Sequence, residues 1–271
     1  MSWRFKRRKF HDPAIAALIA EDIRQANPDH IALTGDIVNI AAHAEFPRAA
    51  RWTQALGDVS FVPGNHDAYV ACAWEKGLHH MAPWMSSDMR VGRTMTSHEI
   101  ASPFPYVRLR KNVALIGLSS ARPQALHRAA GQLGTAQIES LRTLLGDLRE
   151  RGFARIVLIH HPPLPGLAIA RKALGDAGPL AEVLEQEGAE LVLHGHNHLH
   201  MQNTLKTSTG TAHVLGVPSA SMNAHSHSPL AAWNLYNISR HEGRWLTHVT
   251  IRSLVPATMA METLKEFSLS S

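Results

Sequence analysis

Apolar residues recur along this chain with two spacings, and each spacing predicts a different kind of element. Between Pro13 and Asn27 they come every three or four positions, which predicts a helix with one buried face. Asp12 precedes that helix as an N-cap. Short apolar runs predict buried strands instead. Helices are expected over 13–26, 45–56, 135–148 and 179–187, and strands over 31–34, 59–62, 106–110, 113–118, 156–159, 191–193, 213–217, 232–239 and 245–251.

The order of these elements predicts a mixed α/β fold. Strands and helices alternate over the first two thirds of the chain, which is typical of a parallel sheet. Strands then follow one another, which favours antiparallel pairing at the end. Two sheets packed face to face, with helices outside, accommodate this order. Since no repeat or linker interrupts it, we expect a single domain over 1–271, with an irregular insertion at 68–105 that covers the functional site.

Polar residues that suit metal binding follow four of the predicted strands. Because the carboxyl ends of parallel strands meet at one edge of a sheet, we expect these residues to lie together. Taken one at a time they also fit a turn, a helix cap or a buried histidine, but four cases in one chain favour a site for a divalent transition metal. The four segments are Gly35-Asp36, Gly64-Asn65-His66-Asp67, His160-His161-Pro162-Pro163 and Gly195-His196-Asn197-His198.

The net charge of +5 has a local origin in five basic residues between Arg4 and Lys9. The remaining 22 basic and 22 acidic residues balance. Aromatic residues interleave with the basic ones, so contact with nucleic acid or an anionic membrane surface is one interpretation, and a solvated chain end is the other. A single cysteine, Cys72, excludes an internal disulfide. With no long apolar run or signal peptide, we expect a cytoplasmic protein without a membrane span.

Together the four segments resemble the motifs of the calcineurin-like metallophosphoesterases, in order and spacing from residue 31 to 198. The resemblance implies a four-layer α/β/β/α sandwich with two divalent ions, Mn, Fe, Zn or Co, at the strand ends. It also implies a metal-dependent phosphoesterase that hydrolyses a phosphodiester or a phosphomonoester. Two ions clamp the oxygens of an in-line displacement and stabilise its charge.

The same resemblance assigns metal ligands by position. Asp36 would contact both ions. Asn65, His160 and His196 would complete one ion site, and His198 would serve the other.

Residues next to these ligands receive the remaining roles. His66 would stand beside the phosphate as a proton donor, with Asp67 holding its tautomer, and both Asn65 and His66 would contact the substrate. His161 competes with His160 for the ligand position and is a weak candidate for substrate contact. We favour His160, because His161 precedes a proline and is expected to turn away.

One family motif is missing, an Asp-x-His that ends a first strand and serves the same ion as His198. His11-Asp12 reverses that order and follows no strand. Either the sequence given starts too late, or this protein has lost one metal site. Loss of a central strand would expose apolar edges, which favours the first explanation.

Other functions remain open at this point. The protein could be an inactive or single-metal scaffold of the same fold, or a nuclease. His225 and His227 either line the pocket or belong to a surface loop, and Cys72 is expected to pack in the interior.

Overall fold

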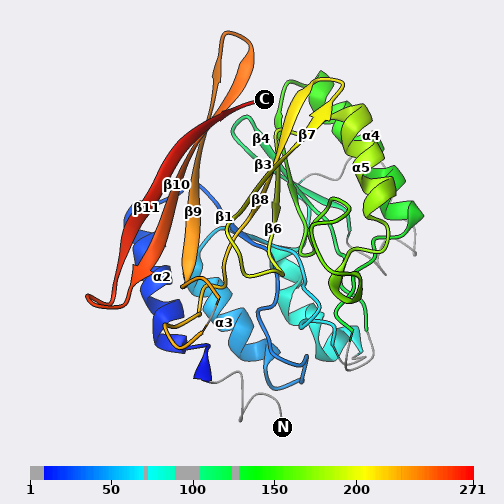
Figure 1. Cartoon of the computed structure of the whole chain (residues 1–271). Helices are drawn as coiled ribbons and strands as arrows, with labels where there is room; N and C mark the ends of the chain where they lie inside the picture. Colours follow the sequence, from blue (N-terminus) through cyan, green and yellow to red (C-terminus); the bar gives the residue numbers. More distant parts are fainter. Residues whose placement is uncertain (1–8, 70–72, 89–103, 124–127, 227) are drawn as a thin grey trace.

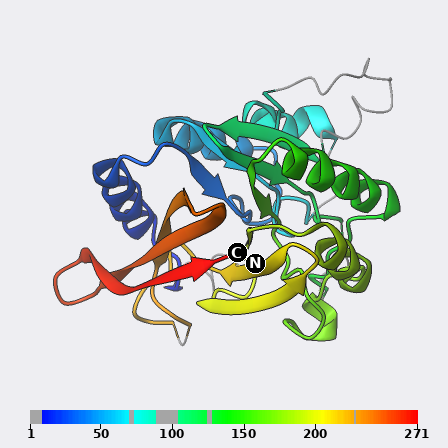
Figure 2. The ribbon, with the colours of Figure 1, turned by 90° about the horizontal axis from the view of Figure 1, so that it is seen from above.

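The computed structural model describes residues 9–69, 73–88, 104–123, 128–226 and 228–271. Its layers run α/β/β/α, as predicted (Figure 1). Helices α2 (Pro13–Ala26) and α3 (Phe46–Leu56) form one outer layer. Helices α4 (Thr135–Glu150) and α5 (Ala177–Glu187) form the other, and two sheets lie between. Seen from above, α2 lies on the opposite side of the molecule from α4 and α5 (Figure 2).

One sheet is continuous and has six strands in the order β3-β4-β5-β6-β8-β7. Its central strands are parallel, and β3 and β7 run antiparallel at the two edges. The predicted antiparallel pairing of 213–217 is wrong in part, because β8 joins β6 in parallel and finds its antiparallel partner in β7. The strands are β3 (Tyr106–Arg110), β4 (Val113–Gly117), β5 (Ala154–Leu158), β6 (Leu191–His194), β7 (Met201–Thr207) and β8 (Gly210–Gly216).

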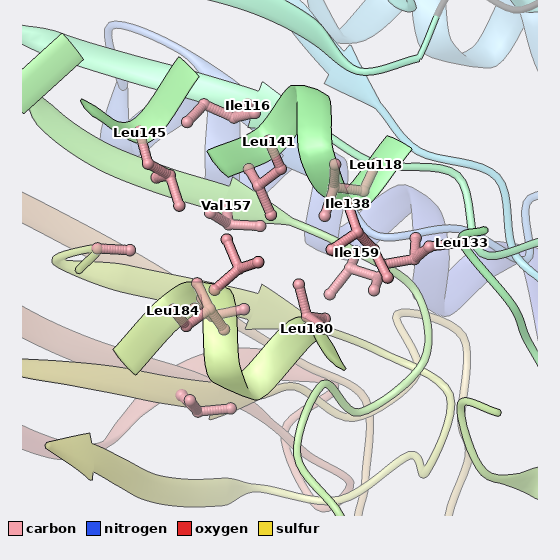
Figure 3. Packing of buried hydrophobic residues seen from close by; sticks show 14 of the residues in the cluster. Ile116, Leu118, Leu133, Ile138, Leu141, Leu145, Val157, Ile159, Leu180 and Leu184 are labelled. Atoms are coloured by element: carbon pink, nitrogen blue, oxygen red, sulfur yellow. The ribbon is translucent and has the colours of Figure 1, made fainter. Parts of the chain in front are cut away.

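Helices α4 and α5 cover the outer face of this six-stranded sheet (Figure 3). Ile138, Leu141 and Leu145 of α4 are buried at helical spacing. They belong to one apolar cluster with Val157 of β5 and Leu184 of α5. Burying such a side chain stabilises the fold by about 1.5–3 kcal/mol, so this layer anchors the strands that it covers.

The other sheet is divided into two blocks. Strands β1 (Ile31–Leu33) and β2 (Val59–Phe61) pair in parallel, as predicted. Strands β9 (Ala232–His241), β10 (Arg244–Val255) and β11 (Ala260–Ser270) form an antiparallel meander. Within the described residues, no hydrogen-bonded strand connects β1 to β9.

The N-cap residue and the proline at the start of the first helix predicted its position correctly. The Asp12 carboxylate accepts a hydrogen bond from the Ala14 N–H at 2.8 Å, and Pro13 occupies the first turn. Asn27 then ends α2 with φ of 47°, a left-handed conformation that asparagine tolerates well. None of the described helices is both long enough and apolar enough to cross a membrane.

The described part of the expected insertion at 68–105 contains two short 3-10 helices, η2 (Trp74–Lys76) and η3 (Leu78–Trp84). Met81 and Met85 are fully buried in the apolar cluster that contains Phe61. This part of the segment is therefore integral to the core. Cys72 and residues 89–103 lie outside the described residues. A further 3-10 helix, η4, spans Ala170–Lys172.

Candidate metal centre

Four polar side chains converge between the two sheets. Asp36 and Asn65 follow β1 and β2 of the divided sheet, whereas His160 and His196 follow β5 and β6 of the six-stranded sheet. The expectation that they share one sheet edge is therefore wrong, since two facing sheets each contribute a pair. Asn65, His160 and His196 are buried.

The donor atoms of these residues lie within a few ångströms of one another. His160 Nε2 is 3.2 Å from Asn65 Oδ1, 3.1 Å from His196 Nδ1 and 3.4 Å from Asp36 Oδ2. His196 Nδ1 is 3.0 Å from Asn65 Oδ1. For comparison, Zn–N bonds of about 2.0–2.1 Å in a tetrahedral site separate neighbouring ligand atoms by about 3.3–3.4 Å. The spacing thus matches ligands of one ion.

The protonation pattern also fits a cation. The Nδ1–H of His160 donates to the Thr34 carbonyl at 2.6 Å, which leaves a lone pair on Nε2 facing Asn65 and Asp36. Three acceptors, His160 Nε2, Asn65 Oδ1 and Asp36 Oδ2, then lie close together. At most one N–H, that of His196 Nδ1, lies among them as a donor. His196 Nε2 is buried without a hydrogen-bond partner in the described structure. An excess of acceptors at one point is what a divalent ion satisfies.

The amide of Asn65 adds a neutral oxygen to these donors. Among the described residues, no three histidine, cysteine, aspartate or glutamate side chains are arranged to hold an ion by themselves. Mixed nitrogen and oxygen ligands without thiolate suit Mn, Fe, Zn or Co.

Asp67 organises the loops of the divided sheet. Its carboxylate accepts three backbone N–H groups, from Asp36 at 2.7 Å, Val38 at 3.0 Å and Gly64 at 2.8 Å. Burial, followed by the nearby negative charge of Asp36, raises the pKa of Asp67 to about 7. The expectation that Asp67 holds the tautomer of His66 is wrong, because both of its oxygens bind the backbone that presents Asp36 and Asn65.

Asp36 itself is held as an anion. Burial raises its pKa, but His160, His66 and His196 together lower it more, to about 2. Its Oδ1 accepts the His66 N–H at 2.9 Å, and its Oδ2 faces His160. Asp36 therefore keeps a negative charge at the point where the acceptors converge.

The His66 ring is oriented by a different group than expected. Its Nδ1 donates to the carbonyl of Asn39 at 2.6 Å, and its ring stacks on Tyr69 with centroids 5.7 Å apart. His66 lines the same cavity as Asp36 and His160. The bond through Nδ1 and the stacked Tyr69 ring fix the orientation of the His66 imidazole at the cavity wall.

His198 lies beside a residue whose position the sequence did not reveal. The ring of His11 packs edge-on against the ring of His198 with centroids 6.0 Å apart. His11 Nδ1 lies 2.8 Å from Ser221 Oγ, and both histidines line the cavity that contains Asp36. Burial, countered by Asp36 and reinforced by His11, lowers the pKa of His198 to about 4. His198 is thus a neutral imidazole close to Asp36, and His11 lies against it.

Other candidate histidines have different surroundings. His161 Nδ1 contacts Ser120 Oγ at 2.7 Å and its Nε2 donates to the Ala129 carbonyl at 3.1 Å, so both ring nitrogens have protein partners. Burial and the neighbouring His160 lower the pKa of His161 to about 3. His225 is exposed and is not among the residues that line the cavity. His227 lies outside the described residues.

The backbone at the strand ends is strained. Asp36, His196 and His198 have φ of 61°, 67° and 55°, the left-handed region that costs a residue with a Cβ about 1–2 kcal/mol. Gly64 allows the loops to approach closely, because a Cβ there would collide with the Asp36 carboxylate and the His160 ring. Such strain gathers at functional sites.

Comparison with known proteins identifies the family of this chain. The model of the calcineurin-like phosphoesterase family matches residues 8–200. The chain belongs to this family. A Synechococcus protein named as a probable cyclic nucleotide phosphodiesterase is 25% identical over 238 residues, 86% of this chain and 81% of its own length.

A solved structure resembles the fold of this calcineurin-like phosphoesterase. It is a dimetal phosphatase from Danio rerio with a TM-score of 0.62 and 15% identity, covering 94% of this chain and 88% of its own. A Vps29 single mutant from Entamoeba histolytica has a TM-score of only 0.40 at 13% identity.

Proposed function

We propose that this protein hydrolyses phosphate esters in a reaction that requires divalent metal ions. The observation that carries the proposal is the meeting of Asp36, Asn65, His160 and His196 with more lone pairs than protons. The relative from Synechococcus favours phosphodiesters as the first substrates to test. Ions held there would supply Lewis acidity toward water and the phosphoryl oxygens, and would neutralise their charge.

The protein's own groups have separate tasks in this proposal. Asp36 provides the negative charge that offsets the ions, and Asn65, His160 and His196 complete one ion site. His198, with its neighbour His11, serves the second.

His66 lines the cavity and its Nδ1–H donates to the Asn39 carbonyl; as imidazolium, protonated at both nitrogens, the ring would give its Nε2 proton to the leaving oxygen and become neutral. Asn65 also contacts a phosphoryl oxygen through its amide. Asp67 positions Asp36 and Asn65 through the backbone.

Purified protein should hydrolyse bis(p-nitrophenyl) phosphate with added Mn²⁺, Zn²⁺, Co²⁺ or Fe²⁺ and lose activity in EDTA. His160→Ala should lower kcat/KM by more than the roughly 10–100-fold typical of losing an outer partner of a metal ligand. It should also lower the metal content per chain, measured by elemental analysis. His80→Ala, an exposed histidine of η3, is the control and should change neither.

The outcomes separate the alternatives. Retained turnover by His160→Ala would contradict the ligand assignment. Bound metal without turnover of either phosphodiesters or phosphomonoesters would indicate a scaffold. Salt-dependent cleavage of DNA or RNA would indicate a nuclease, although four of the five basic residues that suggest it, those between Arg4 and Arg8, lie outside the described structure. A cytoplasmic location and a single domain also remain proposals.

A further inference from the structure

One lysine differs in its surroundings from the others that the structure describes. Lys172 belongs to η4, in the connection between β5 and α5, and it is half-buried, whereas every other described lysine is exposed. Among the described residues, no carboxylate forms an ion pair with its ammonium group. Partial burial of a charge without a counter-charge costs free energy. The position of Lys172 therefore indicates a role in binding an anion.

The η4 segment is fixed to the loops of the candidate metal centre. The Leu167 carbonyl, ahead of η4, accepts a hydrogen bond at 2.8 Å from the side-chain amide of Asn197, which stands between the two histidines of its loop. The Arg171 carbonyl accepts the Ala129 N–H at 3.0 Å, and the Ala129 carbonyl in turn accepts from His161 Nε2 at 3.1 Å. Both histidine loops therefore hold η4 beside the site.

The charge of Lys172 acts on two candidate metal ligands. It contributes to the low pKa values of His196 and His198, about 2 and about 4, although burial is the largest cause for both rings. Since such an effect falls off with distance, the ammonium group lies near both rings. His66 approaches the same centre from the facing sheet, because it follows β2 whereas Lys172 follows β5. His66 and Lys172 can therefore contact different parts of one substrate.

The charge balance of the centre indicates what Lys172 would bind. With the two divalent ions of the hydrolase proposed above, on which this step rests, the ligands supply one carboxylate, Asp36, and otherwise neutral amide and imidazole groups. The centre then carries excess positive charge, and a phosphodiester group contributes a single negative charge. A neighbouring ammonium is repelled by such a centre unless the ligand carries more negative charge. A substrate with a second anionic group relieves this repulsion.

We propose that Lys172 determines substrate specificity by binding a second phosphate group, beyond the phosphoryl group that reacts. A terminal phosphate carries about 1.5–2 negative charges at pH 7, so it is a stronger partner for an ammonium than a carboxylate is. A partly desolvated, charge-assisted contact of this kind is stronger than one on an exposed surface. The preferred substrates are therefore phosphodiesters that also carry a terminal phosphate. The ammonium itself takes no part in bond breaking.

Two chromogenic substrates that differ by one phosphate test this inference. They are thymidine 5′-(p-nitrophenyl phosphate) and the same compound with a 3′-phosphate, and both release p-nitrophenol in the same reaction. In the presence of Mn²⁺ the native protein should hydrolyse the 3′-phosphorylated compound with a kcat/KM about 10–100-fold higher, the range expected for one hydrogen-bonded contact between charged groups. The gain should lie mainly in KM, because the added contact is made equally in the bound substrate and in the transition state.

Substitutions of Lys172 separate this contact from a general effect of charge. Lys172→Ala should bring the ratio of the two kcat/KM values close to one, and Lys172→Arg should retain most of it. Lys206→Ala is the matched control and should leave the ratio unchanged. Lys206 is exposed on β7 and pairs with Thr211 near the start of β8, at the end of the sheet away from the candidate site. A lysine with only a structural role would lower both kcat/KM values and leave their ratio high.

Binding without turnover gives an independent measurement. By calorimetry with Mn²⁺ present, thymidine 3′,5′-bisphosphate should bind the native protein at least about tenfold more tightly than thymidine 5′-monophosphate, and Lys172→Ala should remove the difference. This difference without hydrolysis of any ester would contradict the proposed function and support the Lys172 site. Equal affinities in the native protein, or a difference that Lys172→Ala retains, would overturn the inference whether or not esters are hydrolysed.

Discussion

The two sheets of this molecule hold their candidate site residues in place through different interactions. In the six-stranded sheet every interior strand is paired on both sides, and β5 is buried along its whole length. In the divided sheet β1 has three residues and pairs with β2 alone among the strands that the structure describes. Yet each sheet presents two groups to the candidate metal centre. A side chain at a strand end is therefore positioned either by continuous strand pairing or by local cross-links, which here are hydrogen bonds from a carboxylate to the backbone of neighbouring loops.

The cross-links of the divided sheet are polar. Asp67 gathers the loops after β1 and β2 through three backbone N–H groups, and Glu45 does the same for the next turn through Asn39, Ile40 and Ala42. By contrast, His160 follows β5, a strand that is already fixed by pairing on both sides, and its Nδ1–H donates to the Thr34 carbonyl. Three substitutions test this difference.

The largest effect is expected in the six-stranded sheet. Arg155 and Glu190 form a buried pair in which Nε and Nη2 donate to the carboxylate at 3.1 and 2.8 Å. Glu190→Gln leaves a buried guanidinium without its counter-charge, which should lower the free energy of unfolding by about 3–5 kcal/mol in denaturant titrations. Glu139→Gln, whose partner Arg142 lies on an exposed helix face, should cost less than about 1 kcal/mol. Equal losses would mean that burial does not distinguish the pairs.

An intermediate effect is expected where α2 attaches to the meander. The Asp22 carboxylate accepts from Trp233 Nε1 at 2.8 Å and from Arg252 Nε at 3.0 Å. Asp22→Ala removes charge-assisted bonds worth about 1.5–3 kcal/mol. Hydrogen exchange should speed up in α2 and β9 and stay unchanged in β5. Glu21→Ala, next in sequence but exposed, is the control. Faster exchange throughout the molecule would show that the blocks unfold as one unit.

The smallest effect is expected where the two sheets are joined by charge. Asp58 before β2 receives bonds from Arg110 of β3, and this bond, above all, lowers the pKa of Asp58 below its ordinary 3.8. As the pH falls, Asp58 therefore becomes protonated in the unfolded chain while it is still ionised in the folded protein. The stabilisation is present above pH 4 and is lost as the pH falls below it.

Asp58→Asn should reduce this pH dependence and cost up to about 1 kcal/mol, since the carboxylate is partly exposed. Unfolding titrations at several pH values and at 1 M salt measure it. An unchanged acid transition in the variant would exclude the pair as a contributor.

The sequence predicted most of the buried elements, because each carries a clear period. It missed β7 and β11. The residues of β7 alternate between partly buried and exposed, and those of β11 are largely exposed. In Met201–Thr207 and Ala260–Ser270 the polar and charged residues interrupt the apolar positions, so no continuous run remains. These strands are fixed by their neighbours rather than by their own composition.

At the candidate site, residues that directly follow an apolar run could be found from the sequence. The strands deliver Asp36, Asn65, His160 and His196 together, while their roles remain predictions. His11 could not be placed, because its partner Ser221 is 210 positions away. Nor could the task of Asp67 be foreseen, since a carboxylate next to a histidine in sequence looks like its partner.

The left-handed backbone at Asp36, His196 and His198 has an evolutionary consequence. Glycine or asparagine would relieve the local strain at all three positions, so stability alone would drive these residues out. If the proposed chemistry were lost, such replacements would be expected to accumulate at these three positions in homologous sequences, whereas a working site should retain the present side chains in spite of their torsions.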